Sequence, residues 1–147
     1  FSLTSLTTLL TSSVEFIKME CLKQGVDVRF SVEEAEIDCD SHQMKQVILN
    51  VMKNALEAMP SGGLLSVQLE KEDGYAKISI QDNGNGIPPE RMKHLGEPFY
   101  STKEKGTGLG LMICQKIIKE HHGSLSIQSN VTEGTTVTIL LPIAKER

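Results

Sequence analysis

The sequence contains no tryptophan, and aromatic residues of any kind make up only 4% of its 147 residues. Hydrophobic residues make up 39% of the chain. Because so few of them are aromatic, the core must be built mainly from leucine, isoleucine, valine and methionine. No apolar run approaches the roughly 18 residues that cross a membrane. The first residues also lack the basic segment that opens a signal peptide. The length suits a single domain over residues 1–147.

Cysteine is scarce, and positive charge does not prevail. Cys21, Cys39 and Cys114 are odd in number and far apart, so we expect buried thiols in a reducing compartment rather than disulfides or a metal site. The formal net charge of -4 argues against nucleic acid as the main partner. A ligand that carries phosphates would therefore have to be held by a few local groups.

Hydrophobic residues at three- and four-residue steps predict helices over residues 3–24, from 40 or 41 to 59, and over 108–122. The residues placed to cap or end them are Thr4, Gly25, Asp40 or Ser41, and Gly123. Alternating apolar and polar residues predict strands over residues 26–32, 64–69, 75–81, 124–129 and 135–142, with a short one near 37–40. Asp73 and Gly74 form a hairpin turn between two of the strands.

This order of helices and hairpins predicts an α+β fold, in which a mixed, mostly antiparallel sheet packs on about three helices as a two-layer α/β sandwich. Residues 83–106 interrupt the regular pattern and are rich in glycine and proline. A segment this long without regular structure is usually functional or mobile. A short helix over residues 89–95 fits within it, and we expect the segment to be poorly ordered without a ligand.

Residues 81–88, Gln-Asp-Asn-Gly-Asn-Gly-Ile-Pro, come directly after the predicted strand 75–81. A carboxylate at the end of a strand, beside glycines that admit a ligand close to the backbone, can accept a hydrogen bond from a flat ring. The alternative is a simple hairpin turn. Pro88 and Pro89 disfavour that alternative, because prolines cannot pair in a central strand. Asp82 is therefore the candidate ring-binding residue.

Asn50 and Asn54 are four residues apart on the second predicted helix, so they share a face. Amide oxygens there can coordinate Mg²⁺, which takes its other ligands from water and phosphates. The alternative is a solvated polar face, although asparagine is a poor residue for a helix interior.

Residues 106–111, Gly-Thr-Gly-Leu-Gly-Leu, open the third predicted helix. Free backbone N–H groups at such a helix start bind anions. Lys103, just upstream, can supply the positive charge that the chain otherwise lacks. The alternative for residues 101–103 is an ordinary surface turn with a solvated lysine. With Asp82 and the asparagine pair, this helix start points to adenine, Mg²⁺ and phosphates as the ligand groups.

At this point the sequence resembles the ATP-binding catalytic domain of bacterial two-component sensor histidine kinases. Residues 50–55 resemble the N box of that family, residues 82–87 and 106–111 its two glycine boxes, and residues 97–103 its F box. Residues 133–135 resemble its terminal Gly-Thr element. The motifs occur in the family's order over essentially the whole chain, and their form is most similar to the sporulation and nitrogen-regulation kinases. The resemblance implies the Bergerat ATP-binding fold shared with type II topoisomerases, Hsp90 and mismatch-repair ATPases.

The resemblance also implies roles for particular residues. Asp82 would accept a hydrogen bond from the adenine amino group, Asn54 would hold Mg²⁺ with Asn50 beside it as a second candidate ligand, and Lys103 would meet the phosphates. Residues 83–107 would form the ATP lid. The implied catalytic residues are Asn50, Asn54 and Lys103. The implied nucleotide-binding set is Lys53, Asn54, Asp82, Gly84, Gly86, Ile87, Phe99, Thr102, Lys103, Gly106, Thr107, Gly108, Leu109, Gly110, Leu111 and Thr135.

Two positions bear on the chemistry. Many kinases of this class have a basic residue three positions after the metal-binding asparagine, whereas this chain has Glu57, so Lys53 or Lys103 would have to supply that charge. Hydrolases of the superfamily place a glutamate base four residues before the same asparagine, where this chain has Asn50. An amide cannot accept a proton at neutral pH. The domain is therefore expected to bind ATP, to hydrolyse it poorly and to offer the γ-phosphate to another nucleophile.

That nucleophile would be a histidine on a separate dimerising helical hairpin, for which we expect a place upstream of Phe1. None of the four histidines of the chain lies in a recognisable phosphoacceptor motif, so the isolated chain should not autophosphorylate. A response regulator would act downstream. The expected domain is monomeric and cytoplasmic, with membrane anchoring of the parent protein left open. An anti-sigma-type serine kinase or a nucleotide-gated interaction module is the alternative, and residues 97–103 argue against the former.

Overall fold

The computed structural model of the chain describes residues 1–84, 107–130 and 134–144, with residues 107–110 and 130 described by their backbone alone. The helices and strands are β1 (Ser2–Ser5), α1 (Leu6–Gln24), β2 (Val26–Val32), β3 (Glu36–Cys39), α2 (Ser41–Glu57), β4 (Gly63–Glu72), β5 (Tyr75–Asp82), α4 (Thr107–Glu120), β6 (Ser124–Asn130) and β7 (Gly134–Pro142).

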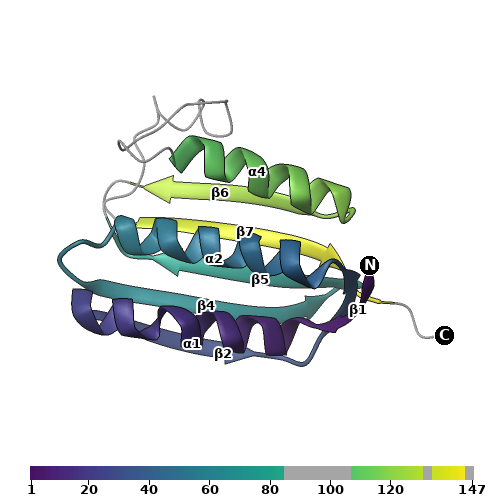
Figure 1. Cartoon of the computed structure of the whole chain (residues 1–147), viewed down its shortest axis with the longest axis horizontal. Coiled ribbons are helices and arrows are strands. Elements are labelled where there is room, and N and C mark those ends of the chain that lie inside the picture. The colour runs from purple at the N-terminus through teal and green to yellow at the C-terminus, as the bar shows by residue number, and fades with distance from the viewer. Residues whose placement is uncertain (85–106, 131–133, 145–147) are drawn as a thin grey trace.

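The main sheet has five strands in the order β2-β4-β5-β7-β6. Only the β2–β4 pair is parallel, and the other three pairs are antiparallel. Figure 1 shows α1, α2 and α4 side by side across one face of this sheet, with α1 near β2 and α4 near β6. A second, two-stranded sheet of β1 and β3 lies at the end of α2 where that helix begins. The predicted two-layer, mostly antiparallel α+β architecture is confirmed.

The core lies between the helix layer and the sheet, and it is aliphatic. The largest fully buried side chains are leucine, isoleucine and methionine, from α1, α2, β4 and β5 among others. All four aromatic side chains in the described residues lie at the surface, the least exposed being Phe30 at 38%. The predicted buried, unpaired thiols are also confirmed, since Cys21, Cys39 and Cys114 are free and buried.

The predicted start of the first helix is wrong. Residues Ser2–Ser5 form β1, which pairs antiparallel with β3, and α1 begins at Leu6. Ser5 rather than Thr4 is the N-cap, because its hydroxyl accepts a hydrogen bond from the Thr8 N–H at 3.2 Å. Leu3 fits the helical spacing of the sequence yet is 60% exposed. Its position is decided by pairing with a distant strand, which local periodicity does not report.

The other caps are mostly as predicted. Asp40 caps α2, its Oδ1 accepting hydrogen bonds from the N–H groups of His42 and Gln43 at 3.0 and 3.1 Å. Gly25 ends α1 in the left-handed conformation. At the end of α4 the left-handed residue is His122, with φ 63°, rather than Gly123. Gly123 follows because a Cβ there would overlap the Leu140 carbonyl oxygen of β7.

The hairpin turn at Asp73 and Gly74 is confirmed, since both residues have positive φ between the paired β4 and β5. The third helix begins at Thr107, one residue before its predicted start. Most of the predicted lid and the short helix over residues 89–95 lie outside the described residues.

Candidate nucleotide site

Asp82 is the last residue of β5, and the sheet places it between two neighbouring strands. It lies opposite Leu65 of β4 and opposite Thr135 of β7. Its side chain is only 4% exposed, and its Oδ1 accepts a hydrogen bond from the Gly84 N–H at 2.9 Å. Beside it, the hydroxyls of Thr135 and Ser129 are 2.9 Å apart. Asp82, the candidate ring-binding residue, is thus a buried carboxylate whose backbone is held by strand pairing on both sides.

Burial raises the pKa of Asp82 above its ordinary value, because desolvation penalises the carboxylate anion. Hydrogen bonds from the backbone at Gly84 and Thr135 oppose this rise in pKa without cancelling it. A buried acceptor with a perturbed pKa is typical of a functional position. Such a group gains most from a ligand that donates a hydrogen bond to it.

The turn after Asp82 joins the sheet to α2. The Asn83 Oδ1 accepts a hydrogen bond from the Leu64 N–H at 2.9 Å, which ties the end of β5 to the start of β4. A Cβ at Gly84 would overlap the carbonyl oxygen of Ala58, just past the end of α2. Only glycine lets the two backbones approach so closely. The turn whose Gly84 N–H binds the Asp82 carboxylate is therefore held against the end of the helix that carries Asn54.

Asn50 and Asn54 are both partly buried on α2, as their spacing predicts. The Asn50 amide nitrogen donates a long contact of 3.8 Å to the Cys114 sulfur on α4. The Cys114 thiol in turn lies 4.0 Å from the Val47 carbonyl oxygen. Burial raises the pKa of Cys114 to about 11, opposed only in part by Asn50. Asn50 thus links the two helices, a contact that no sequence signal indicated.

These contacts fix the relative direction of α2 and α4. Asp40, before α2, is bonded to His121, after α4, while Asn50 contacts Cys114 further along. Along this contact the residue numbers rise in α2 while they fall in α4, so the two helices run antiparallel. Asn54 and the first turn of α4 therefore lie toward the same end of the helix layer, the end at which α4 begins in Figure 1. The predicted metal residue and the predicted anion-binding helix start thus share one end of the helix layer.

The remaining predicted residues are placed unevenly. Leu111 is 4% exposed in α4 and Thr135 is 9% exposed in β7, while Lys53 lies exposed on α2. The structure places Thr107, Gly108, Leu109 and Gly110 in the first turn of α4 by their backbone. Gly86, Ile87, Phe99, Thr102, Lys103 and Gly106 lie outside the described residues.

The donor set suits Mg²⁺ held partly by its ligand. Within residues 1–84, 107–130 and 134–144, no group of three or more His, Cys, Asp or Glu residues could hold a metal ion. An amide oxygen at Asn54 would therefore need phosphates and water to complete the coordination of Mg²⁺.

The helices of the described residues include no candidate for a membrane span, since none combines the required length with the required hydrophobicity.

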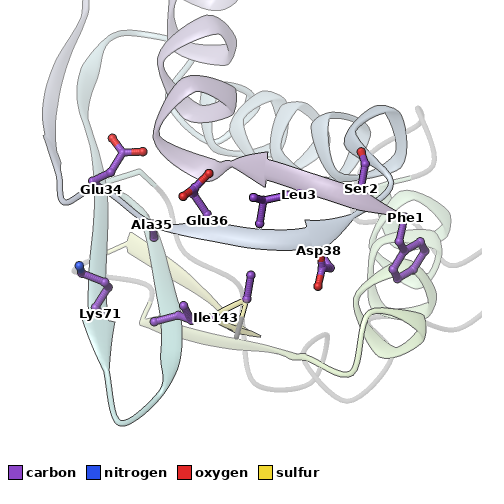
Figure 2. Close-up of a pocket in the computed structure, with 10 residues that line it drawn as sticks. Phe1, Ser2, Leu3, Glu34, Ala35, Glu36, Asp38, Lys71 and Ile143 are labelled. Carbon is purple, nitrogen blue, oxygen red and sulfur yellow. The ribbon is translucent and has the colours of Figure 1, made fainter. Parts of the chain in front are cut away.

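A cavity of about 620 Å³ lies elsewhere, between β1, β3 and the segment after β7. Figure 2 shows its lining, with Leu3 and Ile143 contributing apolar surface and Glu34, Glu36 and Asp38 contributing carboxylates. None of the predicted nucleotide-binding residues lines it.

Comparison with known proteins shows to which family the chain belongs. Residues 39–145 match the family described as histidine kinase-, DNA gyrase B-, and HSP90-like ATPases. The chain belongs to this family. Within it, the chain is similar to sporulation kinase C of Bacillus subtilis, with 49% identity over 110 residues, which are 75% of this chain and 26% of that protein.

Solved structures of histidine kinases share the fold of this ATPase domain. The nucleotide-free catalytic domain of histidine kinase ThkA superposes with a TM-score of 0.88 at 30% identity, covering 97% of this chain and 95% of that one. ThkA in complex with the response regulator protein TrrA matches with a TM-score of 0.84 at 26% identity, over 98% of this chain and 42% of that one. The resemblance to histidine kinase catalytic domains is confirmed. The chain spans about a quarter of the length of sporulation kinase C.

Proposed function

We propose that this chain is the ATP-binding catalytic domain of a histidine kinase, which binds Mg-ATP and donates the γ-phosphate to a histidine on a separate dimerising hairpin. The observation that carries the proposal is the buried Asp82 carboxylate, 4% exposed, at the end of a strand and beside Gly84. A carboxylate in that place accepts a hydrogen bond from the exocyclic amino group of adenine. Membership in an ATPase family supports the same ligand.

The helix side of the site would hold the phosphates and the metal. Asn54 would hold Mg²⁺, with Asn50 as a second candidate ligand, and the free N–H groups at the start of α4 would bind phosphate oxygens. Lys103 and Lys53 would neutralise charge, Phe99 would anchor the lid, and Gly86 and Thr135 would shape the adenine pocket. When bound, Mg²⁺ supplies charge neutralisation and orientation of the phosphates.

Transfer rather than hydrolysis is supported by Asn50. Its amide nitrogen points toward the Cys114 sulfur, and an amide has no basic site that could deprotonate water at neutral pH. The γ-phosphate would therefore await an external nucleophile. We propose that this nucleophile lies in a hairpin of the same parent protein and that a response regulator receives the phosphoryl group afterwards. The complex of ThkA with the response regulator TrrA supports the latter partner.

The test is the affinity for Mg-ATP, measured by titration calorimetry on the unaltered chain and on Asp82→Asn. The amide keeps the size of the carboxylate but loses its charge, so we expect the affinity to fall on the order of 100-fold. Asp27→Asn, the same change at an exposed position of β2, should leave the affinity unaltered. Equal affinities in all three proteins would reject the assignment of Asp82 to adenine.

The isolated chain should take up no stable label from γ-labelled ATP. A phosphohistidine formed on a separately produced acceptor hairpin should be acid-labile, whereas a phosphoserine would resist acid. Acid-stable label on the acceptor would favour a serine kinase instead.

A further inference from the structure

We propose that His121 is a positioning residue for the nucleotide site, because its imidazole joins the end of α4 to the N-cap of α2. This inference rests on the proposed function, since it concerns the placement of Asn54 and of the first turn of α4. His121 does not approach the predicted ligand and belongs to none of the motifs considered above. It lies at the opposite end of both helices, where Asp40 begins α2.

The hydrogen bonds of His121 fix both ring nitrogens. The backbone N–H of Asp40 donates to Nε2 at 3.1 Å, so Nε2 carries no proton. The neutral ring then bears its proton on Nδ1, which donates to the Ile117 carbonyl oxygen at 2.8 Å. With the side chain only 3% exposed, water cannot readily replace either partner. Both polar atoms of this buried ring are satisfied, one within α4 and one across to α2.

The hydrogen bond between His121 and Asp40 holds the start of the helix that carries Asn54, the candidate metal ligand. Asp40 caps α2 through Oδ1, and its own N–H is the group held by His121. Asn54 lies fourteen residues further along a rigid helix, about 21 Å from the cap. A shift of the cap along the axis therefore moves Asn54 by a similar amount. Two further polar contacts between α2 and α4 involve the Cys114 sulfur at 3.8 and 4.0 Å, and sulfur is a weak partner.

Phe1 covers the same junction. Its ring stacks on His121 with centroids 4.3 Å apart and an interplanar angle of 13°. Phe1 precedes β1, which pairs with β3, and β3 leads directly into Asp40. Figure 2 shows Phe1 at this end of β1, beside the ribbon of α4, where it also lines the 620 Å³ cavity. The imidazole is thus clamped between the start of the chain, the end of α4 and the cap of α2.

Two substitutions separate the cross-helix bond from the local one. His121→Gln places an amide oxygen near the position of Nε2, so it can still accept from the Asp40 N–H. His121→Asn is shorter, so it can donate to Ile117 but cannot reach Asp40. His122→Asn is the matched control, because His122 is exposed and asparagine tolerates its left-handed conformation.

We would measure the dissociation constant for Mg-ATP at a temperature where every variant is folded, together with hydrogen exchange of the Asp40 amide. His121→Asn should weaken binding about fivefold, roughly the effect of one lost hydrogen bond, and should speed exchange at Asp40. His121→Gln and His122→Asn should stay within about twofold of the unaltered chain. A purely structural role would instead make the affinity follow the melting temperature in both His121 variants.

The inference is overturned if His121→Asn binds Mg-ATP as tightly as His121→Gln while its Asp40 amide exchanges faster. It is also overturned if exchange at Asp40 is unaltered in His121→Asn, since the bond would then not hold the cap. Failure of the proposed function looks different, because the unaltered chain would then not bind Mg-ATP or Asp82→Asn would bind it normally.

Discussion

The two sides of the candidate nucleotide site are held by different means. On the sheet side, Asp82 is fixed by backbone pairing to β4 and β7 and is almost wholly buried. On the helix side, Asn54 is partly exposed, and its position follows from how α2 packs on α4. A backbone ladder tolerates many side-chain changes, whereas helix packing depends on individual side chains. Under the proposed function, adenine recognition would therefore be locally determined, whereas phosphate and metal binding would respond to changes at a distance.

The two sides meet where Gly84 lies against Ala58. This contact is the one place in the described residues where the turn after Asp82 touches the end of α2 closely enough to require glycine. Altering it should couple the two sides in a measurable way.

The largest effect on stability is expected from Gly84→Ala. The added methyl would overlap the Ala58 carbonyl oxygen, so the free energy of unfolding should fall by about 2–3 kcal/mol. Mg-ATP affinity should fall as well, because the turn after Asp82, whose Gly84 N–H binds the carboxylate, must move. Denaturant unfolding and calorimetry would measure both quantities.

Gly74→Ala provides the control. No atom lies within 4 Å of a Cβ there, and the cost comes only from φ at +83°, about 1–2 kcal/mol. It should not change affinity for nucleotide. Unaltered affinity in Gly84→Ala would show that the two sides are independent at this contact.

The next effect concerns the metal. Asn54→Ala should remove the dependence of ATP affinity on Mg²⁺, a loss on the order of tenfold in the presence of Mg²⁺. Asn50→Ala should retain that dependence and instead lower stability by about 1 kcal/mol or less through the lost contact with Cys114. Titrations with Mg²⁺ and with EDTA would distinguish them. Loss of Mg²⁺ dependence in Asn50→Ala would make Asn50 a metal ligand as well.

The smallest effect is a pH dependence on the sheet side. Because burial raises the pKa of Asp82 above 3.8 in the folded protein, the folded state binds this proton more tightly than the unfolded state. The contribution of Asp82 to stability therefore falls as the pH rises from 3.8 through the folded pKa, and the loss persists at neutral pH. Asp82→Asn should be the more stable protein at pH 7, by a margin that disappears below pH 3.8.

Thermal unfolding of both proteins across this pH range would measure the difference. Asp27→Asn should show no comparable gain at pH 7. If Asp82→Asn is instead less stable than the unaltered chain at neutral pH, the folded protein itself stabilises the carboxylate, without any ligand.

Most strands and helices were predictable because their signals are local. The alternation of apolar and polar residues along β4, β5 and β7 follows the two faces of a half-buried sheet. The capping side chain of Asp40 marks the start of α2. Asp82 was identified from its place at the end of a strand, since Asp before a glycine turn is a local pattern. The asparagine pair and the glycine-rich start of α4 were found in the same way.

The predictions from sequence are wrong or missing where contacts with a distant segment of the chain determine the structure. Residues Ser2–Ser5 follow helical spacing but pair with β3, more than thirty residues away. The parallel pairing of β2 with β4 has no local signature, because α2 and other segments separate the strands. Nothing in the sequence indicates that the Nε2 atom of His121 accepts a hydrogen bond from the Asp40 N–H.

The sequence by itself determined the composition of the core, the alternation of the strands, the caps at Asp40 and Gly25, and the choice of Asp82, at the end of a strand, as the candidate ring-binding residue. These depend on side chains and on neighbours within a few residues. The tertiary structure alone decided the strand order, the contact of Gly84 with Ala58, the link between Asn50 and Cys114, and the joining of two helices by His121. Each of these needs atoms that are far apart in the chain, and only the packing of the helix layer on the sheet brings them together.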